Sequence, residues 1–144
     1  DGVSSLWCNV HGHRVAAIDD AVREQLDKIA HTTLLGAASP PSIELGAELA
    51  RRTPGGLSKT FYSDAGATAV ELAFKMAVGY WFHRGRPDKN RFIGLQGAYH
   101  GDTTGSMSVG FSDLFHRPFA SMVFSTFHGP VPQPLEASDQ VSRD

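Results

Sequence analysis

Cysteine is almost absent from this 144-residue chain, which contains only Cys8. A single thiol cannot form a disulfide within the chain, so the sequence excludes a disulfide-built scaffold and agrees with a reducing compartment. The sequence also lacks a long apolar run and a charged-then-apolar leader, which argues against a membrane span and a secretion signal. We therefore expect a cytoplasmic protein without a membrane partner.

Charge of one sign is also lacking, because 13 basic and 15 acidic residues leave a net charge of -2. The basic residues are spread along the chain and form no stripe that could hold a phosphate backbone, so nucleic acid is excluded as the expected partner. A hydrophobic content of 41% is enough for the core of one domain. The chain opens at Asp1 without an initiator methionine and ends in a polar tail, so we expect a piece cut from a larger protein.

Three stretches carry apolar residues at helical spacing. The first predicted helix covers residues 18–30 and has acidic residues near its start, as the helix dipole prefers. Ser39 and Pro40 provide a cap and a first-turn proline for a second helix, which the run at residues 53–56 ends. The third stretch, residues 69–80, predicts another helix that ends before a glycine and a proline.

Short β-prone runs alternate with these helices. We expect strands at residues 3–10, 60–62, 91–95 and 122–124, and a proline-rich loop at residues 129–134. Strands that alternate with helices indicate an α/β fold with a mostly parallel sheet and flanking helices. In such folds ligands bind just beyond the ends of the strands.

The run FYSDAGATA at residues 61–69 places small residues where a strand turns into a helix. Small side chains allow the backbone N–H groups of the first helical turn to approach a phosphate, which the positive end of the helix dipole also favours. We therefore take Gly66 and Ala67 as candidate phosphate donors. A plainer interpretation is that Ser63 or Asp64 only caps the helix.

The run YHGD at residues 99–102 follows the strand predicted at residues 91–95. The ring of Tyr99 could stack on a flat cofactor, and Gly101 permits the tight turn that presents the ring. Because both runs follow strands, we expect this one to lie at the same sheet edge as the phosphate loop. The alternative is an ordinary turn with a packed tyrosine.

Together these two runs resemble the class III aminotransferases, which have the fold-type I architecture of aspartate aminotransferase. The likeness is most specific to the biotin-synthesis branch of that family, on the runs at residues 1–13, 30–36 and 99–103. It extends from residue 1 to about residue 124. The resemblance implies that residues 1–144 are an N-terminal fragment of the major domain of a pyridoxal-phosphate-dependent transferase.

The resemblance also implies a cofactor, pyridoxal 5'-phosphate, and roles for five residues. Gly66 and Ala67 match the phosphate-binding pair of the family, and Tyr99 matches the aromatic residue that stacks on the pyridine ring and contacts substrate. Leu6 and Trp7 match the substrate-pocket aromatics. Leu6 stands where members that use S-adenosylmethionine usually carry tryptophan, so the implied amino donor is either S-adenosylmethionine or lysine. Ala67 replaces a frequent serine, which removes a hydroxyl contact and leaves the backbone N–H.

The reaction implied for the full-length protein is transamination of 8-amino-7-oxononanoate to 7,8-diaminononanoate in biotin biosynthesis. Family members are homodimers with the active site at the interface, so residues 31–41 are expected to reach a partner's pocket. The lysine that bonds to the cofactor, and the aspartate beside the pyridine nitrogen, are expected beyond Asp144. We therefore expect no catalytic residue in this chain, and the fragment alone to be inactive. Its own lysines are expected to be solvated: Lys28, Lys59, Lys75 and Lys89.

Other kinds of site have weaker support. The HGH run at residues 11–13 lacks a third ligand at metal-binding spacing, and Cys8 lacks the electropositive setting of a nucleophile. Ser63, His100 and Asp102 could form a hydrolase triad, but no Gly-x-Ser-x-Gly elbow is present. Two alternatives stay open. One is a non-catalytic, truncated or degenerate copy that keeps only dimer contacts or a cofactor-binding surface, and the other is a class III aminotransferase with a different substrate.

Overall fold

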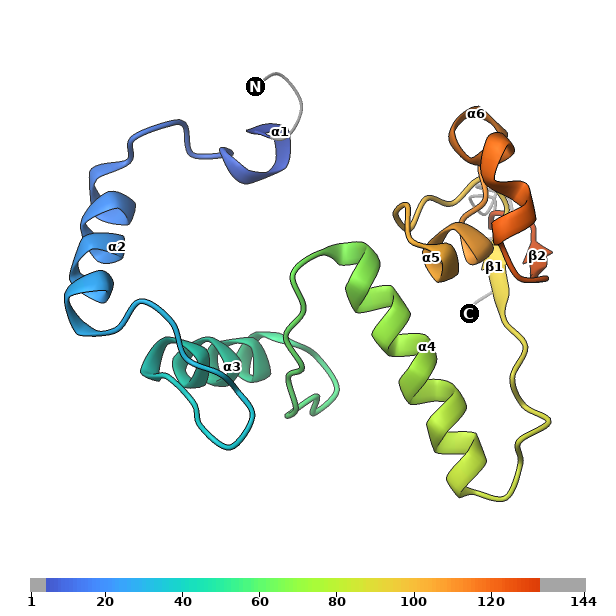
Figure 1. The fold of residues 1–144 in the computed structure, drawn as a ribbon, viewed down its shortest axis with the longest axis horizontal. Helices are drawn as coiled ribbons and strands as arrows, with labels where there is room; N and C mark the ends of the chain where they lie inside the picture. The colour runs from blue at the N-terminus through green and yellow to red at the C-terminus, as the bar shows by residue number, and fades with distance from the viewer. Residues whose placement is uncertain (1–4, 133–144) are drawn as a thin grey trace, which may run out of the picture. The chain divides into compact units, whose positions relative to one another are not determined.

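The computed structural model of the chain describes residues 5–132, with side chains from residue 7 onward. The chain divides into two compact units, Asp1–Thr60 and Phe61–Asp144 (Figure 1). In the described part of both units, no helix is long and apolar enough to cross a membrane.

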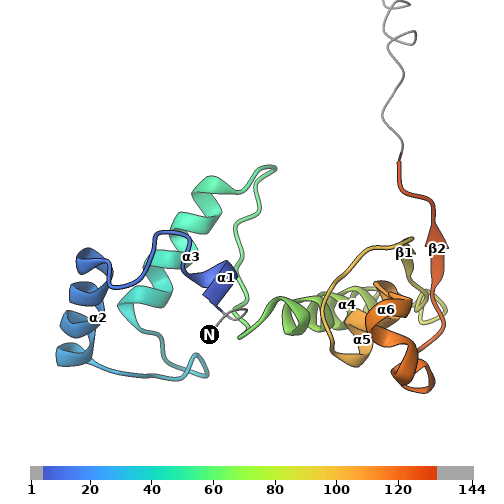
Figure 2. The same ribbon diagram turned by 90° about the horizontal axis from the view of Figure 1, so that it is seen from above.

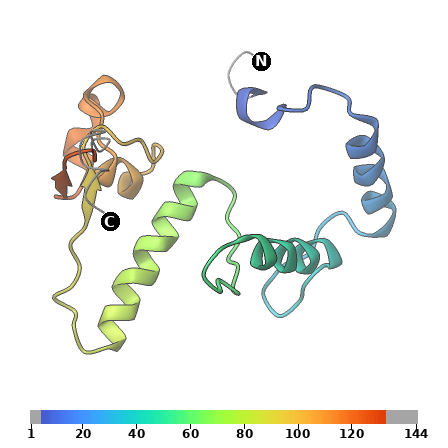
Figure 3. The ribbon, with the colours of Figure 1, turned by 180° about the vertical axis from the view of Figure 1, so that it is seen from behind.

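The first unit contains helices and no described strand (Figure 3). α1 covers Ser5–Cys8, α2 covers Ala16–Lys28 and α3 covers Pro40–Arg52. α2 and α3 confirm the two helices predicted for this region, including the proline in the first turn of α3. Neither helix contains a buried residue, so their apolar stripes lie open within the described chain.

The strand predicted at residues 3–10 is wrong over its described part, which holds the single helical turn α1. An extended segment leaves its backbone N–H and C=O groups unpaired unless another strand lies beside it. No strand is present in the described residues of this unit. A helical turn pairs these groups locally, and Cys8 at its end is exposed and free.

The second unit contains a long helix and a small parallel sheet with short helices between its strands (Figure 2). Its strands pair in parallel, with Ile93 opposite Phe127 and Leu95 opposite Gly129. The predicted α/β class with a parallel sheet is therefore confirmed here. The elements are α4 (Gly66–His83), β1 (Ile93–Leu95), α5 (Thr104–Val109), α6 (Asp113–His116), the 3-10 helix η1 (Arg117–Met122) and β2 (Phe127–Gly129).

α4 ends at His83, shortly before Gly85, as the sequence predicts. This glycine has φ +72, in the left-handed region, and its N–H donates to the Phe82 carbonyl at 3.0 Å. The N–H of Arg86 donates to the Trp81 carbonyl at 2.9 Å. These two bonds form a Schellman motif, which satisfies carbonyl groups left over at the end of the helix.

Phenylalanine rings and a glycine attach the helices to one face of the sheet. Phe74 of α4 lies 4.5 Å from Phe92 and 6.4 Å from Phe124, measured between ring centroids. Gly94 in β1 is buried, and a Cβ atom there would collide with the carbonyl of Val109. α5 can therefore approach β1 closely only because residue 94 has no side chain.

Two further strand predictions are wrong in position. Residues 60–62 form no strand, because no strand in residues 5–132 lies beside them to complete a ladder. The strand predicted at residues 122–124 is also absent, because residue 122 ends η1 and β2 starts only at Phe127. The Phe124 N–H donates to the Ser108 hydroxyl at 3.0 Å, so this N–H is not available to pair with a neighbouring strand. Of the loop predicted at residues 129–134, residue 129 belongs to β2, residues 130–132 are irregular, and residues 133–134 lie outside the described chain.

Candidate functional site

The first turn of α4 has open backbone donors. The helix begins at Gly66, and its first bond runs from the Ala69 N–H to the Ala65 carbonyl at 3.0 Å. The N–H groups of Gly66, Ala67 and Thr68 have no acceptor among residues 5–132. These groups lie at the positive end of an 18-residue helix, where an anion is favoured.

Neither Ser63 nor Asp64 caps α4. The Ser63 hydroxyl donates to the Ala65 carbonyl at 3.3 Å, and Asp64 Oδ1 accepts from the Thr68 hydroxyl at 2.8 Å. The same hydroxyl oxygen of Thr68 accepts from the Ala65 N–H at 3.1 Å. The side chains around the helix start therefore bond to one another and leave the first-turn N–H groups open, against the plainer interpretation.

The loop that carries Tyr99 lies against this helix start. Gly101 has φ +109, and a Cβ atom added there would stand 2.5 Å from the Ala67 Cβ and 3.1 Å from the Ala67 Cα. Real Cβ atoms do not approach other atoms that closely, so only glycine fits. The structure thus brings the two predicted segments together, and Tyr99 is 57% exposed beside them.

Tyr99 belongs to a hydrogen-bonded chain of side chains. Its phenol donates to Asp102 Oδ2 at 2.9 Å, and Asp102 Oδ1 lies 3.1 Å from His116 Nε2. His116 Nδ1 accepts the Ser112 backbone N–H at 3.1 Å. Since Nδ1 acts as the acceptor, the neutral imidazole carries its proton on Nε2 and donates it to Asp102.

These bonds shift the ionisation of both partners. The hydrogen bond from His116, followed by that from Tyr99, lowers the pKa of Asp102. The hydrogen bond to Asp102, followed by desolvation, raises the pKa of Tyr99. The hydrogen bond between the Tyr99 phenol and the Asp102 carboxylate is therefore fully formed at pH values above the ordinary pKa of aspartate. It is lost as pH falls through the lowered pKa of Asp102. At high pH it is lost as pH rises through the raised pKa of Tyr99.

α4 and α5 are joined directly behind this loop. Glu71 of α4 accepts the Gly105 N–H at 2.5 Å through its Oε1 atom. At the start of α5 the Ser106 hydroxyl accepts the Thr103 N–H at 3.0 Å. Residues 105–109 of α5 are all buried. The site loop is therefore fixed at both ends, by Gly101 on α4 and by the first turn of α5.

Of the three residues predicted to contact substrate, Tyr99 lies in the second unit and the other two lie in the first. Leu6 and Trp7 belong to α1, Trp7 is 82% exposed, and the side chain of Leu6 lies outside the described part. Their expected pocket with Tyr99 therefore stays a prediction.

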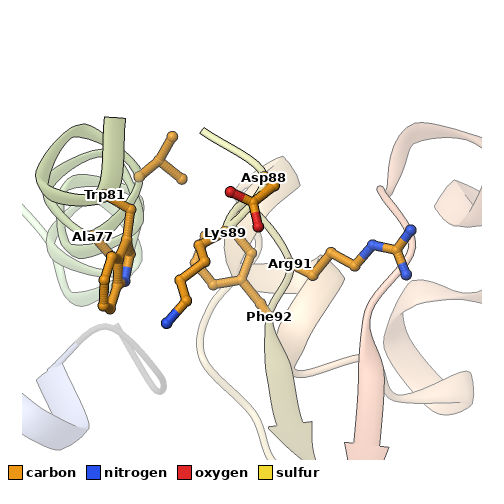
Figure 4. Close-up of a pocket in the computed structure, with 7 residues that line it drawn as sticks. Ala77, Trp81, Asp88, Lys89, Arg91 and Phe92 are labelled. Carbon is orange, nitrogen blue, oxygen red and sulfur yellow. The ribbon is translucent and has the colours of Figure 1, made fainter. Parts of the chain in front are cut away.

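A hollow of about 420 Å³ lies at the opposite end of α4 (Figure 4). Lys89 extends toward Trp81, with its ammonium nitrogen 3.7 Å from the ring centroid, whereas Arg91 points away from the indole. Lys89 is thus exposed, as expected, but it also makes a cation–π contact that the sequence did not predict. Lys28, Lys59 and Lys75 are exposed.

The other kinds of site gain no support from the geometry. Residues 5–132 contain no cluster of three or more side chains suited to a metal ion. Asp102 bonds His116 rather than His100, and the Ser63 hydroxyl donates to a backbone carbonyl, so these residues do not form the order of contacts that a hydrolase triad requires.

Two residues of the site were missed from the sequence. His116 follows Asp102 by 14 positions, and Glu71 precedes Gly105 by 34. No local spacing relates either pair, because the folding of α5 and α6 brings them together. The one usable signal was for His116, a histidine directly after the apolar residues Leu114 and Phe115, where burial requires hydrogen-bond partners.

Comparison with known proteins agrees with this geometry. A family model described as aminotransferase class-III matches residues 1–143. The adenosylmethionine-8-amino-7-oxononanoate aminotransferase of Anoxybacillus flavithermus is 52% identical over 132 residues, which are 92% of this chain and 29% of that protein. The enzyme of the same name from Aquifex aeolicus is 51% identical with the same shares. This chain therefore spans less than a third of these relatives.

Solved structures show the same likeness. The adenosylmethionine-8-amino-7-oxononanoate aminotransferase from Methanocaldococcus jannaschii matches with a TM-score of 0.85 and 46% identity, over 97% of this chain and 32% of that one. An (S)-enantioselective omega-transaminase from Thermomicrobium roseum matches with a TM-score of 0.80 and 33% identity, with the same shares. The predicted resemblance and fold class are confirmed, and the chain belongs to the class III aminotransferase family.

Proposed function

We propose that the full-length protein carrying this chain transfers an amino group to 8-amino-7-oxononanoate, giving 7,8-diaminononanoate for biotin synthesis. Two relatives that are 52% and 51% identical to this chain are named for an aminotransferase of 8-amino-7-oxononanoate. The observation that supports a shared site most directly is the contact of Gly101 with Ala67, which brings the Tyr99 loop to the open end of α4.

The residues present fit pyridoxal 5'-phosphate. Gly66 and Ala67 would donate their open N–H groups to its phosphate. A Cβ atom at Gly66 would meet nothing within 4 Å in the described part of the chain apart from the nearby backbone of its own helix, so space adjoins the donors. The exposed ring of Tyr99 would stack on the pyridine. When bound, the cofactor supplies an electron sink that eases loss of a proton from the amine-bearing carbon.

The residues of this chain would bind and orient rather than transfer protons. Asp102 fixes the phenol of Tyr99 by its 2.9 Å bond, and this sets the plane of the ring that faces the cofactor. We assign the covalent lysine and the aspartate beside the pyridine nitrogen to the remaining two-thirds of a protein as long as these relatives. The chain of residues 1–144 would then be a fragment of the major domain and inactive alone.

Leu6, Trp7 and Tyr99 would each contribute to the substrate pocket, as the resemblance to the family implies. Trp7 is exposed and so has a large apolar surface available to the hydrocarbon chain of 8-amino-7-oxononanoate. The amino donor would be S-adenosylmethionine or lysine. Leu6 is smaller than the tryptophan usual in users of S-adenosylmethionine, and this is the feature of the chain most relevant to the choice.

The enzyme would act in the cytoplasm as a homodimer with the active site at the interface. The stretch of residues 31–41, which ends in the first turn of α3, would contribute to the partner's pocket. Leu35 in this stretch is 91% exposed, and its burial under a second subunit would stabilise the dimer.

Parallel assays test the proposed function. The full-length protein, loaded with pyridoxal phosphate, is given 8-amino-7-oxononanoate with either S-adenosylmethionine or lysine, and 7,8-diaminononanoate is measured by mass spectrometry. We expect product with one of the two donors and none from the isolated chain. Binding of the cofactor without product from either donor would reject the biotin assignment.

A second candidate is an aminotransferase for other amines. The solved omega-transaminase from Thermomicrobium roseum matches the same share of this chain at 33% identity, so the fold is not restricted to one substrate. Turnover of simple amines with pyruvate, combined with no turnover of 8-amino-7-oxononanoate, would favour this candidate.

A further inference from the structure

His116 is a buried side chain of the site, and both of its ring nitrogens are hydrogen-bonded. It is 1% exposed and lies at the end of α6. Its two ring nitrogens are both bonded, Nδ1 to the Ser112 N–H and Nε2 to Asp102. Phe111 and Phe115 lie 5.8 and 6.3 Å away, measured between ring centroids. The imidazole therefore has a fixed position and a fixed tautomer.

The same imidazole supports Tyr99 by two routes. Its ring is nearly parallel to the Tyr99 ring, with an interplanar angle of 16° and a centroid distance of 5.9 Å. It also donates to Asp102 Oδ1, and Asp102 Oδ2 accepts the phenol. Asp102 is otherwise an exposed side chain, so His116 is the buried anchor for the carboxylate that orients Tyr99.

We propose that His116 is a positioning residue for Tyr99, acting through Asp102 and through ring contact. A buried, doubly bonded imidazole loses little entropy when it holds a partner, because it is already immobile. The role of Tyr99 toward a cofactor rests on the proposed function. The coupling of His116 to Tyr99 depends only on the contacts within this chain.

Two substitutions separate the bonds of His116. In His116→Asn the amide oxygen lies near the place of Nδ1 and can accept the Ser112 N–H, but the side chain is too short to reach Asp102. In His116→Gln the amide nitrogen lies near the place of Nε2 and can donate to Asp102. Both variants remove the ring, so they share the loss of packing and differ in the bond that matters here.

The first measurement needs no cofactor. Tyr99 is titrated in the full-length apoprotein by NMR of labelled tyrosine, with Tyr99→Phe to assign its signal. The bond to Asp102 raises the pKa of Tyr99, so we expect His116→Asn to lower it toward the ordinary tyrosine value and His116→Gln to keep it raised. An unchanged Tyr99 titration in a folded His116→Asn protein would overturn the proposal.

The second measurement is a double-mutant cycle on kcat/KM. We expect His116→Asn to lower kcat/KM by about tenfold, as loss of a hydrogen bond to a charged group implies, and His116→Gln to stay within about threefold of the original value. In the Tyr99→Phe background, His116→Asn should have almost no further effect. An equal loss in both backgrounds would show a merely structural role and overturn the proposal. If the original protein turns over no substrate, the proposed function fails, and the Tyr99 titration still decides the role of His116.

Discussion

Gly101 meets two demands that no other residue can meet together. Its φ of +109 lies in the left-handed region, and the Ala67 Cβ occupies the place where its own side chain would stand. We expect Gly101→Ala to destabilise the full-length protein by about 2 to 4 kcal/mol, since backbone strain and overpacking add. The same change should weaken binding of pyridoxal phosphate, because it moves the Tyr99 loop from the α4 start. Denaturant unfolding and cofactor titration measure the two effects.

Gly85→Ala is the matched control for that substitution. Gly85 also has positive φ, +72, but a Cβ atom there would meet nothing within 4 Å. We expect a loss of only about 1 to 2 kcal/mol from backbone strain, with cofactor affinity unchanged. Equal effects of the two substitutions on cofactor binding would show that the contact between Gly101 and Ala67 does not shape the site.

For single residues, the sequence predicted those site positions that are marked by a pattern of a few neighbouring residues. Gly66 and Ala67 could be found because a helix start and a small-residue run are readable along the chain, and Tyr99 because a glycine turn follows a strand. Their roles toward a cofactor stay predictions. His116 could not be assigned from the sequence, because its bonds to Asp102 and its contact with Tyr99 exist only after α6 has folded against the loop.

Among the elements, the pair α4 and α5 determines where the site loop lies. The link between them is the bond from the Gly105 N–H to Glu71. We expect Glu71→Ala to leave this part-buried N–H without an acceptor, at a cost of about 1 to 3 kcal/mol. Hydrogen exchange of the α5 backbone in the full-length protein should become faster, because the first turn opens more often.

Glu71→Gln is the control, because its amide oxygen can still accept the Gly105 N–H. We expect exchange in α5 close to that of the original protein in this variant. Exchange that is equally slow in Glu71→Ala would mean that packing alone holds α5 and that the Glu71 bond contributes nothing.

Helices were predicted better than strands, for a physical reason. α2, α3 and the end of α4 follow from periodicity, proline and glycine, which act within a few residues. A strand depends on a neighbour that the local sequence does not show. The run at residues 122–124 has the composition of a strand, but Ser108 takes the N–H of Phe124 and the strand forms later, at β2.

In the described part of the chain, most large apolar side chains are exposed to solvent, and few are buried. The buried hydrophobic side chains of the described part are Met107 and Val109. On the side of the sheet away from Gly94, Ile93 is 76% exposed, and Leu95 and Phe127 are exposed as well. α2 and α3 bury no residue. Relatives more than three times as long have further chain with which to cover such surfaces, and stable domains require that cover.

The isolated 144-residue chain should therefore not fold cooperatively. We expect a broad thermal transition by circular dichroism, strong binding of the dye ANS, and association at micromolar concentration, because exposed apolar faces bind one another. The full-length protein, measured under the same conditions, should melt sharply and bind little dye. Mixing the isolated chain with the separately expressed remainder of the protein should reduce dye binding if the remainder covers these faces. A sharp transition of the isolated chain with little dye binding would contradict this expectation, because it would show that the packing around Phe74, Phe92 and Phe124 is a sufficient core.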